Sequence, residues 1–120
     1  IEHCLHVMRG VDYLGEQAKI AAVMHDLLED HPKLYTVDKL LALGFHATTV
    51  GIIDLLTHKK GESYETYILR LSVSAIARTI KMADLRHNSD IHRMKGLTEK
   101  DFTRLVKYHK AYAFLKAITD

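Results

Sequence analysis

The stretch Ala18–Asp30, AKIAAVMHDLLED, decides the fold that the rest of the chain must build around. Its first half is mostly apolar or small, whereas its second half carries His25, Asp26, Glu29 and Asp30. With about 3.6 residues per helical turn, these four polar side chains would share one broad arc of a helix. A helix this apolar belongs in a protein interior, where uncompensated carboxylates are unfavourable. The pattern therefore predicts a positive partner facing the arc, and a divalent metal ion is the simplest one.

Composition indicates one all-α domain over residues 1–120. A chain of 120 residues can bury one hydrophobic core but is too short for two. With one proline and six glycines, the sequence has little material for hairpins. A net charge of +2 without a Lys/Arg block argues against a nucleic-acid partner, and no apolar run is long enough for a membrane span. Cys4 is the single cysteine, which is typical of a reducing cytoplasm. Because the chain begins on an isoleucine beside chemically important residues, we expect an N-terminal helix to precede it.

Helical spacing and capping residues predict a compact bundle of about seven helices. Pro32 should end the central helix, and Gly44 should end the next one in the left-handed conformation. N-caps are expected at Thr36, Ser63, Ser74 and Thr98, the last in a capping box with Asp101. The expected helices cover residues 1–13, 16–30, 37–43, 46–57, 64–71, 75–94 and 99–118.

Histidine and aspartate residues in three separate segments are candidate metal ligands. His25-Asp26 supplies two, and an isolated pair of this kind is commonly a cap or a surface feature. Two further segments strengthen the case: the first helix offers His3, with His6 as a competitor, and the long helix at 75–94 offers Asp84. Imidazole and carboxylate ligands together suit Mn²⁺, Fe²⁺, Zn²⁺ or Ni²⁺ better than Ca²⁺.

The long helix also carries a polar face formed by Lys81, Asp84, His87 and Asn88, at spacings of three and four. Lys81 fits either a substrate contact or a salt bridge to Asp84, and we expect His87 to make a structural hydrogen bond. Several histidine and lysine residues outside these motifs are expected at the protein surface. Surface positions are predicted for the histidines at 31, 46, 58, 92 and 109, for the Lys59-Lys60 turn and for the 107–110 face of the last helix.

The order His3 … His25-Asp26 … Asp84 resembles the H…HD…D pattern of the HD-domain metal-dependent phosphohydrolases. Within that superfamily, the sequence is most similar to the (p)ppGpp hydrolase domain of the RelA/SpoT homologues and to the small alarmone hydrolases. The similar segments are His3–Val7 (H-P-L-x-V in that family), Ala22–Asp30 (ALLHDxxED), Leu56–Ile68 and Ile80–Asn88, where IKMADLRHN is close to IKLADRLHN.

The resemblance implies the HD-domain fold and one divalent metal, usually Mn²⁺, held by His3, His25, Asp26 and Asp84. It implies that Glu29 and Asp30 form the acid/base pair for a metal-activated water. The implied activity is removal of the 3′-pyrophosphate from (p)ppGpp, the nucleotide of the stringent response, in the cytoplasm. Substrate contacts are predicted at Lys81, Asn88, Thr57 and Tyr64, with Asn88 at the ribose.

Cys4 stands where the family has proline, and two further departures from the family pattern bear on the site. The family reads Asp-Arg-Leu-His-Asn, whereas this chain reads Asp84-Leu85-Arg86-His87-Asn88, so its arginine is rotated by about 100° around the helix and could face away from the site. The family's upstream Arg-Lys segment, which packs on the guanine base, does not occur in this sequence. Three other functions therefore stay open: an HD-type 5′-nucleotidase or other nucleotide phosphatase, a non-catalytic nucleotide-binding module and, least favoured, a nucleic-acid-binding helical domain.

Overall fold

The computed structural model describes residues 2–11 and 14–120, and the regular elements within these ranges are all helical. The all-α prediction is therefore confirmed for the described residues. None of their helices is both long and apolar enough to cross a membrane. In chain order the elements are α1 (Glu2–Gly10), α2 (Glu16–Val23), α3 (Leu27–Asp30), α4 (Val37–Ala42), α5 (Ala47–Leu55), α6 (Tyr64–Leu71), α7 (Ala75–Asn88), the 3₁₀ helix η2 (Ile91–Arg93) and α8 (Glu99–Thr119).

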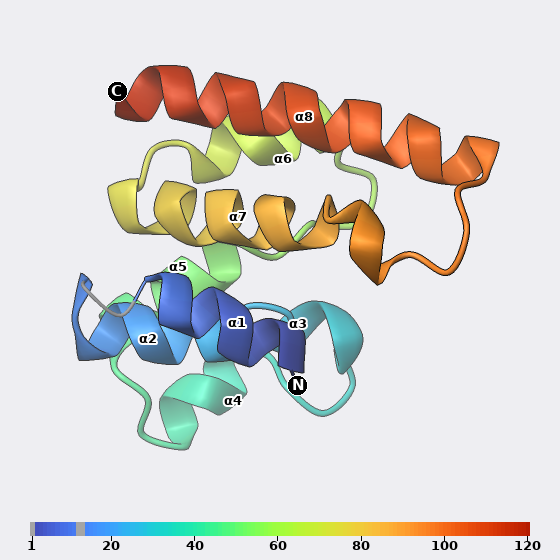
Figure 1. Ribbon diagram of the computed structural model, residues 1–120. Helices are drawn as coiled ribbons and strands as arrows, with labels where there is room; N and C mark the ends of the chain where they lie inside the picture. The colour runs from blue at the N-terminus through green and yellow to red at the C-terminus, as the bar shows by residue number, and fades with distance from the viewer. Residues whose placement is uncertain (1, 12–13) are drawn as a thin grey trace.

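Helix α7 lies at the centre of the arrangement. Figure 1 shows α8 and α6 above it and α1, α2 and α4 below it, and α7 contacts α1, α2, α5 and α8. Ile80 and Ala77 of α7 are buried in one apolar cluster with α1, α2 and α5, whereas Leu85 is buried in a second cluster with α6 and α8. Since α7 packs against both clusters, its polar residues are held between the two halves of the molecule.

The predicted helix over residues 16–30 is wrong in one respect, because the chain breaks between α2 and α3 at Met24–Asp26. The His25 ring hydrogen-bonds the Ala22 carbonyl through Nδ1 at 2.6 Å. A local side-chain bond of this kind competes with the backbone ladder of a helix. The Leu27 amide donates to the carbonyl of Met24, which makes a tighter turn. The break places His25 and Asp26 at a corner between two helices rather than along one helix.

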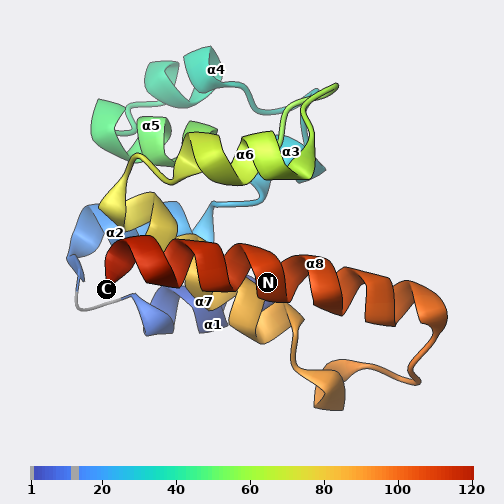
Figure 2. The ribbon, with the colours of Figure 1, turned by 90° about the horizontal axis from the view of Figure 1, so that it is seen from above.

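The predicted end of the long helix near residue 94 is also wrong, because α7 ends at Asn88. Asp90 then accepts a hydrogen bond from the amide of His92 and caps the separate helix η2. Figure 2 shows that the connection from η2 to α8 projects beyond the end of α7, together with the first turns of α8. The first helix ends at Gly10 rather than residue 13, and residues 12 and 13 lie outside the described ranges.

The remaining boundaries follow the capping residues closely. The predicted N-caps at Thr36, Ser63 and Ser74 are confirmed, since each side chain accepts a hydrogen bond from the amide three residues later. The capping box of Thr98 with Asp101 is present at the start of α8. Gly44 has a φ of 96°, the left-handed conformation expected after α4. The cap at Ser63 fixes the start of α6, and this helix forms part of the wall of the site described next.

Candidate active site

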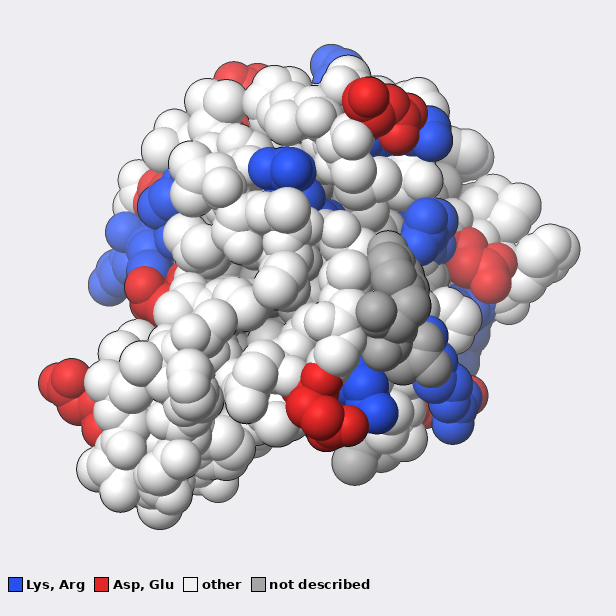
Figure 3. All heavy atoms as spheres, turned by 90° about the vertical axis from the view of Figure 1, so that its left-hand side faces the viewer, with Lys and Arg blue, Asp and Glu red and all other residues white. Residues whose placement is uncertain are grey.

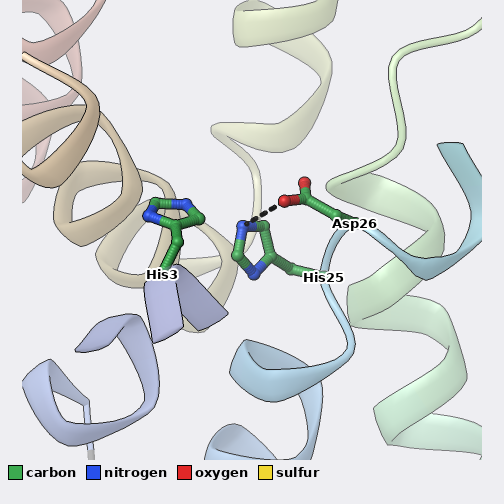
Figure 4. A group of neighbouring side chains, drawn as sticks. All are labelled: His3, His25 and Asp26. Carbon is green, nitrogen blue, oxygen red and sulfur yellow. Dashed lines mark ion pairs between the residues drawn. The ribbon is translucent and has the colours of Figure 1, made fainter. Parts of the chain in front are cut away.

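The four predicted metal ligands lie together, although they come from three separate segments of the chain. His3 Nε2 lies 2.6 Å from Asp84 Oδ1, and His25 Nε2 lies 3.2 Å from the same oxygen. His25 Nε2 is also 3.3 Å from Asp26 Oδ2. Figure 4 shows His3, on α1, facing His25 and Asp26 at the corner between α2 and α3. One nitrogen or oxygen atom from each of these three residues lies within 4.8 Å of the others.

This cluster contains nitrogen and oxygen atoms of the kinds that could hold a divalent cation. His25 is 2% exposed, and its Nδ1 is held by the Ala22 carbonyl, so Nε2 is the nitrogen directed at the carboxylates. Asp84 is 4% exposed and lies opposite both imidazoles. Two imidazoles with two carboxylates form a ligand set for Mn²⁺, Fe²⁺, Zn²⁺ or Ni²⁺. His6, the competitor of His3, is exposed and stacks on His87 instead.

Asp84 is the electrostatic centre of the cluster. Burial would raise its pKa, but hydrogen bonds from His25 and His3, together with Lys81, hold the pKa well below its usual value. Lys81 Nζ donates to Asp84 Oδ2 at 2.9 Å, and Asn88 Nδ2 donates to Asp84 Oδ1 at 3.1 Å. Burial would lower the pKa of Lys81, but Asp84 outweighs burial and the pKa is raised. Asp84 is therefore charged, and Lys81 and Asn88, one turn before it and one turn after it on α7, keep it oriented.

The pKa values of the two residues at the corner respond differently to burial. Burial raises the pKa of Asp26, and the nearby charge of Asp84 raises it further. For His25, burial acts to lower the pKa, but the hydrogen bond and charge of Asp84 outweigh burial and raise it. A cation bound among these groups would remove the repulsion between the two carboxylates.

A cavity of about 280 Å³, here called the polar cavity, opens beside Asp26 and Asp84. Residues from α3, α6, α7, α8 and the connection between α5 and α6 form its wall. They are Asp26, Glu29, His58, Tyr64, Tyr67, Lys81, Asp84, Asn88, Lys107 and Tyr108. The cavity thus connects the cluster of His3, His25, Asp26 and Asp84, here called the ligand cluster, to other polar groups. These groups could bind or react with a small anionic molecule.

Glu29 and Asp30, the predicted acid/base pair, face different hollows. Glu29 lines the polar cavity, and its carboxylate accepts a hydrogen bond from the amide of His58. Burial raises the pKa of Glu29. Asp30 is exposed and lines a second hollow of about 570 Å³, here called the apolar hollow. Successive side chains of a helix point in directions about 100° apart around its axis. Two adjacent residues therefore seldom face the same cavity.

Three of the four predicted substrate-binding residues line the polar cavity, namely Lys81, Asn88 and Tyr64. The Tyr64 hydroxyl is buried and has no hydrogen-bond partner among the described residues, and burial raises its pKa to about 12. Thr57 is not part of this wall: it is buried and its hydroxyl donates to the Ile53 carbonyl at 2.8 Å. Its role is to hold the end of α5.

Sequence reasoning missed four residues of the polar cavity, namely His58, Tyr67, Lys107 and Tyr108. His58 is exposed, as predicted, but its ring also stacks on the Tyr67 ring at a centroid distance of 4.8 Å. Lys107 Nζ lies 4.6 Å from the centroid of the Tyr64 ring, which brings a cation from α8 to the cavity. Lys107 and Tyr108 reach the cavity because α8 packs across α6 and α7. No local sequence motif predicts that packing.

The displaced arginine faces away from the ligand cluster. Arg86 is exposed, and its guanidinium contacts Tyr112 of α8, with Nη1 at 3.3 Å from the hydroxyl. Leu85, which occupies the family's arginine position, is buried in the cluster between α6 and α8. The positive charge at the polar cavity therefore comes from Lys81 and Lys107.

Comparison with known proteins identifies no relative: no protein-family model matches the chain, and no curated protein matches it significantly in sequence. The likeness of its motifs to the HD-domain phosphohydrolases stays a prediction. The functional argument therefore depends on the geometry of the site.

Proposed function

We propose that this chain has the HD-domain fold and is a metal-dependent phosphohydrolase resembling the (p)ppGpp 3′-pyrophosphohydrolases. One observation carries the proposal: His3, His25, Asp26 and Asp84 converge at the wall of a cavity that also contains Glu29. The single cysteine and the absence of a membrane-spanning helix among the described residues are compatible with the cytoplasmic location that we propose.

The ligand cluster would hold one divalent cation, with Mn²⁺ as the first choice and Fe²⁺, Ni²⁺ or Zn²⁺ as alternatives. When bound, such an ion supplies positive charge for the phosphoryl group and lowers the pKa of water. His25 contributes Nε2 because its Nδ1 is engaged by Ala22. Lys81 and Asn88 keep Asp84 oriented toward the two imidazoles.

Glu29 is the residue best placed to accept a proton from the attacking water. Its carboxylate lines the cavity, and the amide of His58 fixes the direction in which it points. Burial raises its pKa, and a base whose pKa is closer to neutrality transfers protons more effectively near pH 7. Asp30 faces the other hollow, so we assign the proton transfer to Glu29 alone.

The charges and rings of the polar cavity favour a phosphorylated nucleotide. Lys81 and Lys107 bring positive charge from α7 and α8, which suits a phosphate or pyrophosphate group. Tyr64 and Tyr108 offer aromatic surface to a sugar or a base.

The direct test is incubation of the Mn²⁺-loaded protein with ppGpp, followed by measurement of GDP and pyrophosphate. We expect both products in equal amounts, and Glu29→Gln should slow their formation roughly 10²–10⁴-fold while the protein keeps its metal. Intact ppGpp after long incubation with the metal-loaded wild-type protein would overturn the pyrophosphohydrolase assignment.

A panel of substrates separates the alternatives. Release of inorganic phosphate from nucleoside monophosphates, with ppGpp untouched, would favour an HD-type 5′-nucleotidase or another nucleotide phosphatase. Nucleotide binding without turnover would favour a non-catalytic binding module. A nucleic-acid-binding domain is disfavoured because basic and acidic side chains are interspersed on the face in Figure 3, where no basic stripe is visible.

A further inference from the structure

The two imidazoles of the ligand cluster are held by different hydrogen-bond partners. His25 Nδ1 faces the Ala22 carbonyl at 2.6 Å. His3 Nδ1 instead faces Nδ1 of His87, on α7, at 2.5 Å. A carbonyl oxygen can only accept a hydrogen bond, whereas an imidazole nitrogen can accept or donate one. The orientation of His3 therefore depends on another histidine, His87.

The geometry of the His3–His87 pair is that of a hydrogen bond between ring edges. The two ring planes differ by 5°, and their centroids are 4.8 Å apart. With the two Nδ1 atoms 2.5 Å apart, this centroid separation is about the largest that two imidazoles can have. The rings must therefore lie side by side in one plane, with the two nitrogens pointing at each other, and they do not overlap face to face.

His6 holds His87 in that plane. The His6 and His87 rings are stacked at a centroid distance of 3.9 Å, with 10° between their planes. His6 and His3 lie three positions apart on α1 and so share one face of the helix. The Arg93 guanidinium also fixes the backbone at this point by donating to the His87 carbonyl at 2.8 Å. Neighbours on two elements thus position the His87 ring.

We propose that His87 is a positioning residue that accepts the Nδ1 proton of His3 and so directs His3 Nε2 into the ligand cluster. The inference rests on the proposed metal-dependent function. A histidine that binds a metal through Nε2 carries its remaining proton on Nδ1, and ligating histidines commonly donate that proton to a fixed acceptor. For His25 the acceptor is the Ala22 carbonyl, and for His3 it is Nδ1 of His87. His87 then carries its own proton on Nε2.

The test compares divalent-metal affinity among variants of the full chain, by titration with Mn²⁺ and by the absorption spectrum of the Co²⁺-loaded protein. His87→Phe keeps a ring for His6 to stack on but removes the acceptor, and we expect metal affinity to fall roughly 10–100-fold. His87→Asn puts an amide oxygen near the place of Nδ1, so it should restore most of the affinity and the wild-type spectrum. His6→Phe keeps the stack and the acceptor, so its affinity should stay close to that of the wild-type protein.

The outcomes separate this inference from the proposed function. Wild-type affinity in His87→Phe, or equal losses in His87→Asn and His87→Phe, would overturn the role of His87 and leave the phosphohydrolase proposal standing. A wild-type protein that binds no divalent metal would overturn both. A wild-type protein that binds metal tightly but hydrolyses none of the nucleotides would overturn only the proposed activity. Thermal unfolding of the metal-free variants checks that each one folds.

Discussion

The two hollows beside Asp26 differ in volume and in the side chains that line them. The apolar hollow has about twice the volume of the polar cavity, at about 570 Å³ against about 280 Å³. It is bordered mainly by apolar side chains of α2, α3, α4 and the turn after α4, such as Leu27, Leu40 and Phe45. The polar cavity instead contains Glu29 and Lys81 beside Asp84. The charged side chains of α7 therefore line the smaller of the two hollows, and the larger one is mainly apolar.

The difference arises from the way α7 and α3 present their residues. Lys81, Asp84 and Asn88 recur at spacings of three and four, so all three face the polar cavity. Helix α3 is a single turn, and its consecutive acids Glu29 and Asp30 diverge toward the two sides. Variants that change one hollow at a time therefore test whether the two sides have different roles.

The largest effect is expected from Asp84→Asn, which removes the charge that faces both imidazoles while keeping the size of the side chain. The variant should lose most of its bound metal and all measurable turnover. Asp30→Asn, on the side of the apolar hollow, should keep one metal per chain. Atomic spectroscopy after gel filtration measures the metal content of both variants. Equal metal content in the two would contradict the assignment of Asp84 as a ligand.

A second contrast is that of Glu29→Gln with Asp30→Asn. Because only Glu29 lines the polar cavity, Glu29→Gln should lower kcat by roughly 10²–10⁴-fold, the usual contribution of a general base. Asp30→Asn should change kcat much less. Steady-state kinetics with metal-saturated protein provides the measurement, and a reversed order of the two effects would show that the base is on the other side of the corner.

A smaller effect is expected from Lys107→Ala, which removes the cation that α8 contributes to the polar cavity. We expect KM for a nucleotide substrate to rise about tenfold, equivalent to about 1.4 kcal/mol, with metal content unchanged. Lys110→Ala is the matched control, because Lys110 is exposed on the same helix and is absent from the lining of the polar cavity. If both variants have the same KM, Lys107 does not contact the substrate.

The smallest effect concerns the connection between α5 and α6, which carries His58. Arg70 donates to Glu62 through two nitrogens, at 2.8 and 3.1 Å, and also to the Thr57 carbonyl at 2.7 Å. The hydrogen bonds from Arg70 lower the pKa of Glu62 from 4.5 to about 2. The charged pair therefore stabilises the fold above about pH 4.5, and this contribution disappears as the pH falls through 2.

Urea unfolding at several pH values tests the pair. Glu62→Gln should be less stable than the wild-type protein at pH 6, and the difference should shrink as the pH is lowered from 5 to 2. A difference that is independent of pH would mean that the charge of Glu62 contributes nothing to stability.

Local signals in the sequence predict some elements much better than others. Helix α6 begins after Ser63 and ends at Leu71 as expected, because its cap and its apolar spacing agree. The break between α2 and α3 was missed because neither proline nor glycine marks it; the His25 ring makes it by bonding the Ala22 carbonyl. The convergence of the ligand residues followed from the motifs, whereas Lys107 and His58 reach the cavity only through tertiary packing.

The most direct test of the ligand assignment is anomalous diffraction at the manganese edge from crystals grown with Mn²⁺. We expect one strong peak per chain, within bonding distance of His3 Nε2, His25 Nε2 and the carboxylates of Asp26 and Asp84. A folded chain with no peak among these four residues, or with its manganese held elsewhere, would contradict it.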